Sequence, residues 1–356
     1  MRALWPWALG GAAAAALAIG AGEVAAGLIG GQSIVGAIGA LVIELQPPGA
    51  KDFVVQLFGD ADKLVLEVAT ALGGVLAGAL LGLGARLDGR LAPIGFAAFA
   101  LVALVIMSRE AVFDPPAALL TVVIAAYAGI FALRRVLPRP SPAEPAPDGP
   151  LLAGRRAFLL LTAGVLAVGG GLAIVGRYLT TRLPVAAAPI DIPAPGETLP
   201  HPPAAASFDI PELTPIIVPN EDFYRIDTRL SIPRLEGAGW TVRVHGMVER
   251  EVVLSYEQLA GMPLIERYVT IACVSNEVGG YLVGNAKWTG VRLTDVLDMA
   301  GVQEGATQVV GRSWDGWTAG FPTAHLAGAG SDALVALLMN GEVLPAKHGF
   351  PLRLIV

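Results

Sequence analysis

Tyr268-Val-Thr-Ile-Ala-Cys273-Val-Ser-Asn276-Glu-Val-Gly279-Gly280 is the stretch around which the second half of this 356-residue sequence is organised. Tyr268 to Cys273 alternates with a period of two and is rich in β-branched residues, which predicts a strand. The residues that follow are polar and end in two glycines, which predicts a loop. The sequence has one cysteine, and it falls where strand becomes loop. Such strand ends often carry a ligand-binding or catalytic group, although a lone cysteine is more often a small buried apolar side chain.

The composition separates the chain into two unlike halves. Hydrophobic residues make up 54% of the sequence and charged residues only 15%, against the usual quarter, and the apolar excess lies before residue 180. This predicts a membrane-embedded first half. The net charge of −6 and the lack of any Lys/Arg run exclude nucleic-acid binding by a basic patch. One cysteine excludes an internal disulfide and a multi-cysteine zinc site.

The first half is predicted to be an all-α transmembrane bundle. Five apolar segments have about the length of a membrane-spanning helix. A shorter apolar stretch, Ser33 to Leu45, ends before Pro47 and is predicted to be interfacial or re-entrant. The first segment is too long for a signal peptide, so we expect it to be retained. The five predicted spans are residues 3–30, 61–85, 91–108, 117–133 and 156–176.

The basic residues between these segments predict the orientation. With the N-terminus inside, the inner loops hold eight Lys and Arg and the outer loops three, as the positive-inside rule requires. An odd number of spans then places everything after Arg177 outside the cytoplasmic membrane. Glu23 and Glu67 lie within predicted spans, where a carboxylate is a candidate for proton transfer, although a structural role is the more common one. The membrane half has no histidine, which excludes a bis-histidine haem there.

Two proline-rich stretches divide the chain further. Residues 137–150 join the last two predicted spans, and residues 183–220 contain ten prolines. We therefore expect a transmembrane module over 1–180, a linker over 181–206 and an α+β domain over 207–356. Within that domain the sequence predicts strands at 240–245 and 251–254, a capping box at Ser255, a helix over 293–300 and a hairpin at Asn340-Gly341. The sequence stops within a strand-like stretch, so we expect the domain to be truncated at its C-terminus.

Five blocks of this domain resemble the sulfite oxidase family of molybdopterin-dependent oxidoreductases, in order and in spacing over about residues 207–356. The resemblance covers only this domain: the transmembrane module is not part of the archetypal enzymes, and with it we expect a membrane-anchored bacterial type. The blocks are Asn220-Glu-Asp-Phe223-Tyr224-Arg225, Thr270-Ile-Ala-Cys273-Val-Ser-Asn276, Trp288-Thr-Gly290-Val-Arg-Leu, Asp315-Gly-Trp-Thr-Ala-Gly-Phe321-Pro322 and Met339-Asn-Gly341-Glu-Val-Leu-Pro345-Ala-Lys-His348-Gly349-Phe350-Pro351-Leu-Arg353.

The resemblance implies a molybdenum–molybdopterin cofactor, with or without a nucleotide extension. Cys273 would be the metal ligand and, with Arg225, a catalytic residue; a thiolate is the soft donor that such a metal needs beside the pterin sulfurs. Arg353 can fork two hydrogen bonds to a phosphate, and the glycine after His348 allows close backbone approach. The residues that the resemblance assigns to the cofactor are Asn220, Phe223, Tyr224, Arg225, Cys273, Asp315, His348 and Arg353.

The same comparison leaves the substrate open. Sulfite oxidases follow the cysteine with basic residues, whereas here Val274 to Gly280 carry none, so an arginine pocket for sulfite is not evident. Sulfite and a sulfoxide both remain candidates, because each exchanges one oxygen atom for two electrons. Asn276 and Glu277 either line the substrate face or cap the loop. The sequence has no haem motif and no iron–sulfur cysteines, so we expect a separate cytochrome or a quinone as electron partner.

Two other functions are compatible with the residues alone. Cys273 as nucleophile and His348 as base would make an extracytoplasmic cysteine hydrolase or transpeptidase, although no local nucleophile signature surrounds the cysteine. Alternatively, the outer domain is a degenerate pterin-binding fold on a non-catalytic membrane protein. An inert Cys273→Ala variant would indicate the latter, and hydrolysis that is sensitive to thiol alkylation would indicate the former.

Overall fold

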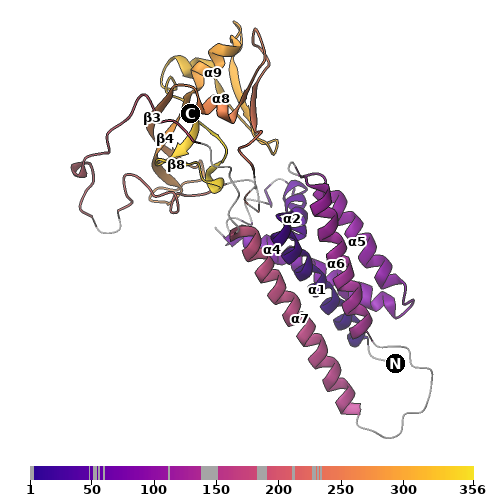
Figure 1. Ribbon diagram of the computed structural model, residues 1–356. Coiled ribbons are helices and arrows are strands. Elements are labelled where there is room, and N and C mark those ends of the chain that lie inside the picture. Colours follow the sequence, from indigo (N-terminus) through magenta and orange to yellow (C-terminus); the bar gives the residue numbers. More distant parts are fainter. Residues whose placement is uncertain are drawn as a thin grey trace. The chain divides into compact units, whose positions relative to one another are not determined.

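The computed structural model describes residues 4–47, 49–50, 54, 57–58, 61–110, 113–137, 151–182, 191–210, 213–226, 230, 232 and 235–356 (Figure 1). The chain divides into two compact units, Met1–Leu183 with Arg229–Ser231, and Pro184–Thr228 with Ile232–Val356. Each unit is described by itself. Most of the proline-rich stretch at 137–150 lies outside the described residues.

The first unit is helical, as predicted. Four of its helices are long and apolar enough to cross a bilayer, namely α1, α4, α6 and α7. Helix α5 has 17 residues and α2 has 11, so both fall short of that length, and the number of five spans stays a prediction. The described helices are α1 (Trp5–Ile29), α2 (Ile34–Glu44), α4 (Asp62–Ala85), α5 (Leu91–Met107), α6 (Pro115–Val136) and α7 (Leu151–Arg182).

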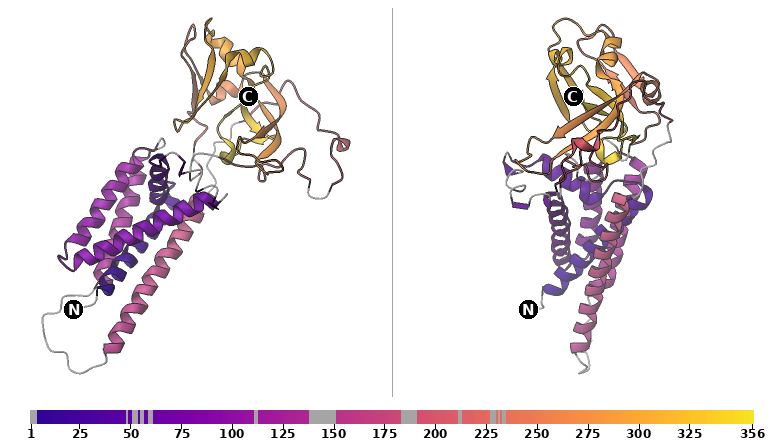
Figure 2. Two further views of the ribbon diagram at one scale, coloured as in Figure 1. Left: turned by 180° about the vertical axis from the view of Figure 1, so that it is seen from behind. Right: turned by 90° about the vertical axis from the view of Figure 1, so that its left-hand side faces the viewer.

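Helix α1 is the centre of this bundle and packs against α4, α6 and α7 (Figures 1 and 2). Glycines allow the backbones to approach closely, the usual device where no water drives helices together. A Cβ on Gly82 of α4 would lie 2.1 Å from the carbonyl oxygen of Trp7 on α1. A Cβ on Gly176 of α7 would lie 2.4 Å from the carbonyl carbon of Glu23. Both contacts therefore require glycine.

Both carboxylates of the predicted spans have partners in the bundle. The Glu23 side chain is 4% exposed, and its Oε1 accepts hydrogen bonds from Ser33 Oγ at 2.9 Å and from the Val35 amide at 3.2 Å. Ser33 also caps α2 by accepting from the Gly36 amide. Glu67 forms an ion pair with Arg177 at 2.8 Å. These contacts tie α2 to α1 and α4 to α7, which is the structural role that the sequence left open.

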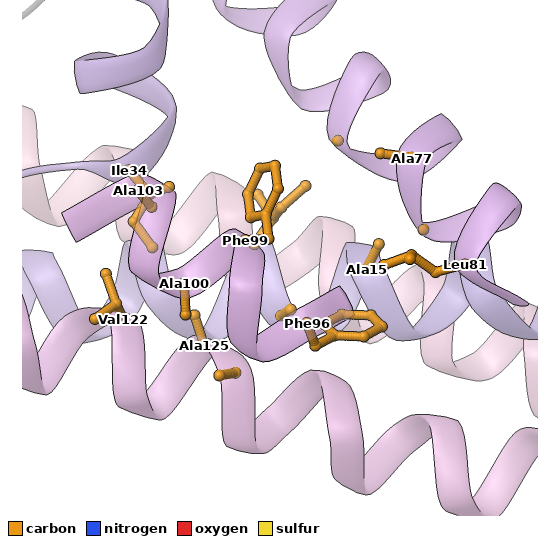
Figure 3. Close-up of a pocket in the computed structure, with 15 residues that line it drawn as sticks. Ala15, Ile34, Ala77, Leu81, Phe96, Phe99, Ala100, Ala103, Val122 and Ala125 are labelled. Atoms are coloured by element: carbon orange, nitrogen blue, oxygen red, sulfur yellow. The ribbon is translucent and has the colours of Figure 1, made fainter. Parts of the chain in front are cut away.

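A cavity of about 60 Å³ lies between α1, α2, α4, α5 and α6 (Figure 3). All the residues that line it are apolar, and Figure 3 shows Phe96 and Phe99 of α5 beside Ala77 and Leu81 of α4. A recognition site for a small polar substrate needs a few convergent polar groups. This cavity offers none from the described residues, so its lining is not that of such a site.

The second unit begins with chain that the sequence analysis assigned to the linker. The amide of Gly196 donates to the Leu264 carbonyl at 3.0 Å, and the Glu266 amide donates to the Glu197 carbonyl at 3.0 Å. Arg267 and Arg292 bind the Glu197 carboxylate at 2.7 and 2.9 Å. Residues 196–199 therefore pair in parallel with β3 at the edge of the sheet. Part of the expected linker thus belongs to the folded unit.

Local signals correctly predicted several elements of this unit. Strands β1 (Thr241–Val244) and β2 (Val252–Ser255) form an antiparallel hairpin. Ser255 and Gln258 make both hydrogen bonds of a capping box at the start of α8 (Tyr256–Ala260). Helix α9 (Leu293–Ala300) ends at Gly301, whose φ is +69°.

One antiparallel sheet forms the core, in the order β3-β4-β7-β8 with β9 on β7. A β-bulge falls between Thr289 and Gly290, where a Cβ on Gly290 would lie 2.1 Å from the Val335 carbonyl oxygen. Asn340 and Gly341 form the β7–β8 turn with positive φ, as their sequence predicted. The strands are β3 (Leu264–Ala272), β4 (Val283–Arg292), β7 (Leu334–Met339), β8 (Glu342–Val343) and β9 (Arg353–Ile355).

Both faces of this sheet are covered. Strand β7 alternates between them: Val335 and Leu337 join a core with α8 and α9, whereas Leu334 and Ala336 join a second core on the opposite face. The second core is completed by segment 218–224 and by Trp288. A separate hairpin, β5 (Gln308–Arg312) and β6 (Thr318–Pro322), was not predicted from the sequence. Short 3₁₀ turns occupy Ala204–Ala206 (η2), Thr323–Ala327 (η3) and Ala346–His348 (η4).

Candidate functional site

The segment before the first strand is bound to the face of the sheet opposite α8 and α9. The Val218 amide donates to the Asn285 carbonyl at 2.9 Å, and Asn285 Nδ2 donates to the Ile216 carbonyl at 2.9 Å. Gly284 leaves room for Phe223, because a Cβ there would lie 2.7 Å from the Phe223 ring. Strand β4 thus fixes the position of the Phe223-Tyr224-Arg225 run.

Aromatic contacts join three of the five sequence blocks. The Phe223 ring stacks on Tyr224 with centroids 5.3 Å apart, and it meets Trp288 edge-on at 6.0 Å and His348 edge-on at 5.5 Å. Trp288 is completely buried. Edge-to-face pairs of this kind add to the burial of the rings themselves. Phe223 therefore contacts residues of two later blocks, Trp288 and His348, the second of which is more than 100 residues away in sequence.

His348 is held neutral inside this cluster. Its side chain is 3% exposed, and its Nε2–H donates to the Asn220 carbonyl oxygen at 2.7 Å. Burial, reinforced by the nearby cations Lys347, Arg353 and Arg225, lowers the pKa of His348 from 6.5 to about 4. At neutral pH the ring is a positioned hydrogen-bond donor and carries no charge.

Arg353 places a cation on the same face. Its guanidinium lies over the Trp288 ring, 5.4 Å from the centroid, and Nη1 donates to the His348 carbonyl at 3.2 Å. Burial lowers the pKa of Arg353, partly opposed by the Tyr224 hydroxyl. Among the described residues no carboxylate forms an ion pair with it. A partly buried guanidinium without a carboxylate partner suits an anionic ligand, because a desolvated charge is costly unless it is paired.

Cys273 is the first residue after β3, as the sequence predicted. Its amide donates to the Leu282 carbonyl at 2.9 Å, which closes the loop that leads into β4. The thiol is free and only partly buried. Burial raises the pKa of the Tyr224 hydroxyl, and Cys273 adds to this rise while Arg353 opposes it. Tyr224 therefore lies within electrostatic reach of both the thiol and the guanidinium.

Asn220 is tied to the C-terminal hairpin through its side chain. Its Nδ2 donates to the Met339 carbonyl at 3.1 Å and to Glu342 Oε2 at 2.9 Å, and its Oδ1 accepts from Asn340 Nδ2 at 2.9 Å. These bonds engage both ends of the amide within the protein. The contact of the Asn220 side chain with a cofactor stays a prediction. The observed side-chain bonds of Asn220 fix the position of its backbone carbonyl, which accepts the hydrogen bond from His348.

Asp315 lies in the turn between β5 (Gln308–Arg312) and β6 (Thr318–Pro322). Its carboxylate accepts from the Ser313 hydroxyl and from the Trp317 amide, the latter at 3.2 Å. These bonds shape the hairpin turn itself. The predicted role of Asp315 at the pterin ring stays a prediction.

The structure therefore gathers six predicted residues around one face of the sheet: Asn220, Phe223, Tyr224, Arg225, His348 and Arg353. Cys273 joins them through Tyr224. The sequence did not predict the roles of Trp288 and Asn340. Trp288 could have been found as the aromatic residue of strand β4, whereas Asn340 was recognised only as a turn residue.

The observed contacts do not favour a cysteine hydrolase. Such an enzyme needs an imidazole within hydrogen-bond reach of the thiol, whereas His348 uses Nε2 on a backbone carbonyl and packs against Phe223. Within the described part of the chain no hydrogen bond joins Cys273 to a histidine.

Comparison with known proteins shows what the C-terminal unit is similar to. The model of the oxidoreductase molybdopterin-binding domain matches residues 229–356. The uncharacterized oxidoreductase YuiH of Bacillus subtilis (strain 168) is 36% identical over 114 residues, which cover 32% of this chain and 54% of that protein. Mitochondrial sulfite oxidase of Homo sapiens is 31% identical over 163 residues, covering 39% and 30%. Nitrate reductase [NAD(P)H] of Hordeum vulgare is 30% identical over 151 residues, covering 35% and 17%. The matched region thus spans about half of the first of these relatives and less of the others.

Proposed function

We propose that this chain is a membrane-anchored enzyme that catalyses oxygen-atom transfer. The proposal starts from the membership of residues 229–356 in the sulfite oxidase family of molybdopterin-dependent oxidoreductases. The substrate of the enzyme would be a small sulfur-containing or similar molecule that gains or loses one oxygen atom for two electrons. The observation that carries the proposal is the Arg353 guanidinium, partly buried without a carboxylate partner among the described residues, on the same face as Cys273 and His348.

The residues present fit a molybdenum–pterin cofactor. Cys273 offers the one thiolate that the metal needs from the protein, at a strand end that fixes its backbone. Arg353 and Arg225 supply cations for the pterin phosphate or its nucleotide extension. When bound, the cofactor supplies the two-electron oxygen exchange itself, and the protein supplies orientation and charge.

His348 and Tyr224 would shape the protein around the cofactor. The neutral His348 ring donates to a backbone carbonyl, which sets the path of residues 220–225. Tyr224 keeps its proton at neutral pH, since its pKa is raised further above an already high value. Its hydroxyl is therefore a hydrogen-bond donor within electrostatic reach of Cys273 and carries no negative charge of its own.

The helical unit would anchor the enzyme in the cytoplasmic membrane. Four helices with the length and composition of membrane spans support this, and the distribution of Lys and Arg supports an inner N-terminus and an outer catalytic domain. Electrons would pass to or from a separate partner, a cytochrome or a quinone. Alkaline phosphatase fused after residue 356 would be active in intact cells if this orientation holds, and inactive if the domain faces the cytoplasm.

The decisive experiment is the metal content of the purified full chain, made in cells competent to synthesise the cofactor. We expect about one molybdenum per chain in the wild type and a loss of most of it in Cys273→Ser and Arg353→Ala. Ser275→Ala, in the same loop, and Arg243→Ala, in an exposed ion pair with Glu251, are the matched controls and should keep the metal. Molybdenum absent from the wild type, or retained in full by both test variants, would refute the proposal.

A further inference from the structure

The apolar cavity of the helical unit reaches the surface of the bundle between α4 and α5. Phe99 of α5 lines the cavity and is 42% exposed, and Ala77 of α4, beside it, is half-buried (Figure 3). In a bundle that spans a membrane, as proposed above, such a surface faces lipid chains, which are as apolar as the cavity itself. A slender apolar group can therefore enter the cavity from the bilayer.

The helix faces that line the cavity continue to two carboxylates. On α1, Ile19 lines the cavity, and Glu23 lies four residues later, on the same face of the helix. On α4, Gly74 lines the cavity, and Glu67 lies seven residues earlier, about two turns away and again on the same face. Glu23 and Glu67 also interact electrostatically with each other. Both carboxylates therefore lie toward one end of the cavity.

This end of the cavity is charged. The Glu67 side chain is 11% exposed and pairs with Arg177 of α7 at 2.8 Å. Arg177 also interacts electrostatically with Glu23, and Lys63 does so with Glu67. Ionisable side chains within a membrane bundle are costly, and they mark functional sites more often than not. A group of charges from three helices, α1, α4 and α7, thus adjoins an apolar space.

Ile34 of α2 connects the cavity to the Glu23 carboxylate. Its side chain lines the cavity, whereas its neighbours Ser33 and Val35 donate hydrogen bonds to Glu23 Oε1 at 2.9 and 3.2 Å. Both of these bonds end on one oxygen, and a carboxylate has about four acceptor positions on its two oxygens. Glu23 therefore has the capacity to accept a further hydrogen bond from a group at this end of the cavity.

These surroundings discriminate between amphipathic molecules by their polar heads. The phosphate of a phospholipid would have to lie against the buried Glu23 carboxylate, and two negative charges repel each other strongly where water is excluded. A neutral hydroxyl would instead donate to that carboxylate, and an attached apolar ring and tail would follow the cavity toward Phe99. The site therefore favours a lipid with a neutral, hydroxyl-bearing head.

We infer, on the basis of the proposed function, that the helical unit binds a lipophilic quinol, with the head at Glu23 and the ring or tail along the cavity. Oxidation of a quinol breaks two O–H bonds and releases two electrons and two protons, which leaves the quinone. The two electrons equal those of the proposed oxygen-atom transfer. A quinol and an oxygen-bearing substrate thus give the quinone, the reduced substrate and one water, and the reverse holds for a substrate that gains oxygen. Glu23 accepts the first proton, and the second passes to solvent.

Photolabelling of the purified full chain tests where such a molecule binds. The probe is an azido derivative of decylubiquinone, cross-linked in detergent, and the labelled peptides are identified by mass spectrometry. We expect the label on α1, α2, α4 and α5, and we expect decylubiquinol to compete with it. Decylbenzene, which has a ring and the same tail without the oxygens, should not compete. A label scattered over all helices, or equal competition by decylbenzene, would indicate an ordinary lipid contact and overturn the inference.

Two substitutions separate the head from the tail. Glu23→Gln keeps an accepting oxygen but removes the charge, and should weaken competition by decylubiquinol about tenfold or more, as expected for the loss of a hydrogen bond to a charged group. Ala77→Leu narrows the cavity and should reduce the labelling itself. Glu44→Gln and Ala98→Leu, at exposed positions of α2 and α5, are the matched controls. Thermal unfolding followed by circular dichroism checks that each variant is folded. Folded test variants that behave like their controls would overturn the inference.

Molybdenum content, measured on the same samples, distinguishes the two levels of failure. A chain that holds molybdenum but is not labelled at the cavity keeps the proposed function and refutes only the quinol site. A chain that is labelled at the cavity but holds no molybdenum refutes the proposed function, while the binding site itself stands.

Discussion

Lowering the pH should destabilise the C-terminal unit through the protonation of His348. The pKa of this imidazole is about 4 in the folded protein and 6.5 in the unfolded chain. Because the folded pKa is the lower one, the unfolded chain binds more protons between these values, so the free energy of unfolding falls as the pH falls through this window. At pH 5 the unfolded ring is almost fully protonated and the folded ring about one-tenth, which corresponds to a loss of about 2 kcal/mol relative to pH 8.

Urea unfolding of the full chain in detergent, followed by tryptophan fluorescence at pH 8, 6.5 and 5, measures this loss. His348→Gln removes the titrating group, so its stability should change by about 2 kcal/mol less over the same range. His245→Gln, at an exposed position, should behave like the wild type. Equal pH dependence in the wild type and in His348→Gln would show that the ring is not held neutral by burial, and the assignment of His348 as an uncharged donor would be wrong.

Three further substitutions test the packing that positions the site. Gly290→Ala should destabilise the unit by about 3 kcal/mol or more, because its Cβ would meet the Val335 carbonyl oxygen at the bulge; a cost below 1 kcal/mol in urea unfolding would contradict the described bulge. Ser255→Ala removes one half of the capping box and should cost about 1 kcal/mol, with no change in molybdenum content. Lys287→Met leaves the buried Glu266 carboxylate without its ion-pair partner at 2.8 Å and should cost about 3 kcal/mol, a loss that Glu266→Gln in the same chain should partly restore.

The sequence predicted the elements whose signals are local. The capping box at Ser255, the helix end at Gly301 and the Asn340-Gly341 turn each depend on a few neighbouring residues, and the structure has all three. The apolar segments of the first half likewise lie in helices, since length and hydrophobicity alone decide this. The strand that leads to Cys273 was recognised but began four residues earlier than its alternation indicated, at Leu264.

What the sequence could not supply depends on contacts between distant residues. The β5–β6 hairpin and the binding of Glu197 to the sheet edge follow from pairing partners that no local pattern reveals. For the site, the residue types were available from the sequence, but the neutral state of His348 is a consequence of its burial. The exposure of Val274 and Val278 likewise depends on the conformation of the loop after Cys273, which hydrogen bonds of Asn276 to the Cys273 carbonyl and the Leu282 amide fix.

The bonds of Asn220 and Asn340 have a consequence for the timing of assembly. Asn220 is bound to Met339, Asn340 and Glu342, and its carbonyl to His348, all of them 119 to 128 residues later in the chain. Contacts of such long range form late, because a large loop must close first. The Phe223-Tyr224-Arg225 run therefore cannot reach its final position until residues 339–348 have been synthesised and bound to Asn220. The cofactor would have to be inserted into a chain already made through β9, so the supply of cofactor must coincide with a nearly complete fold.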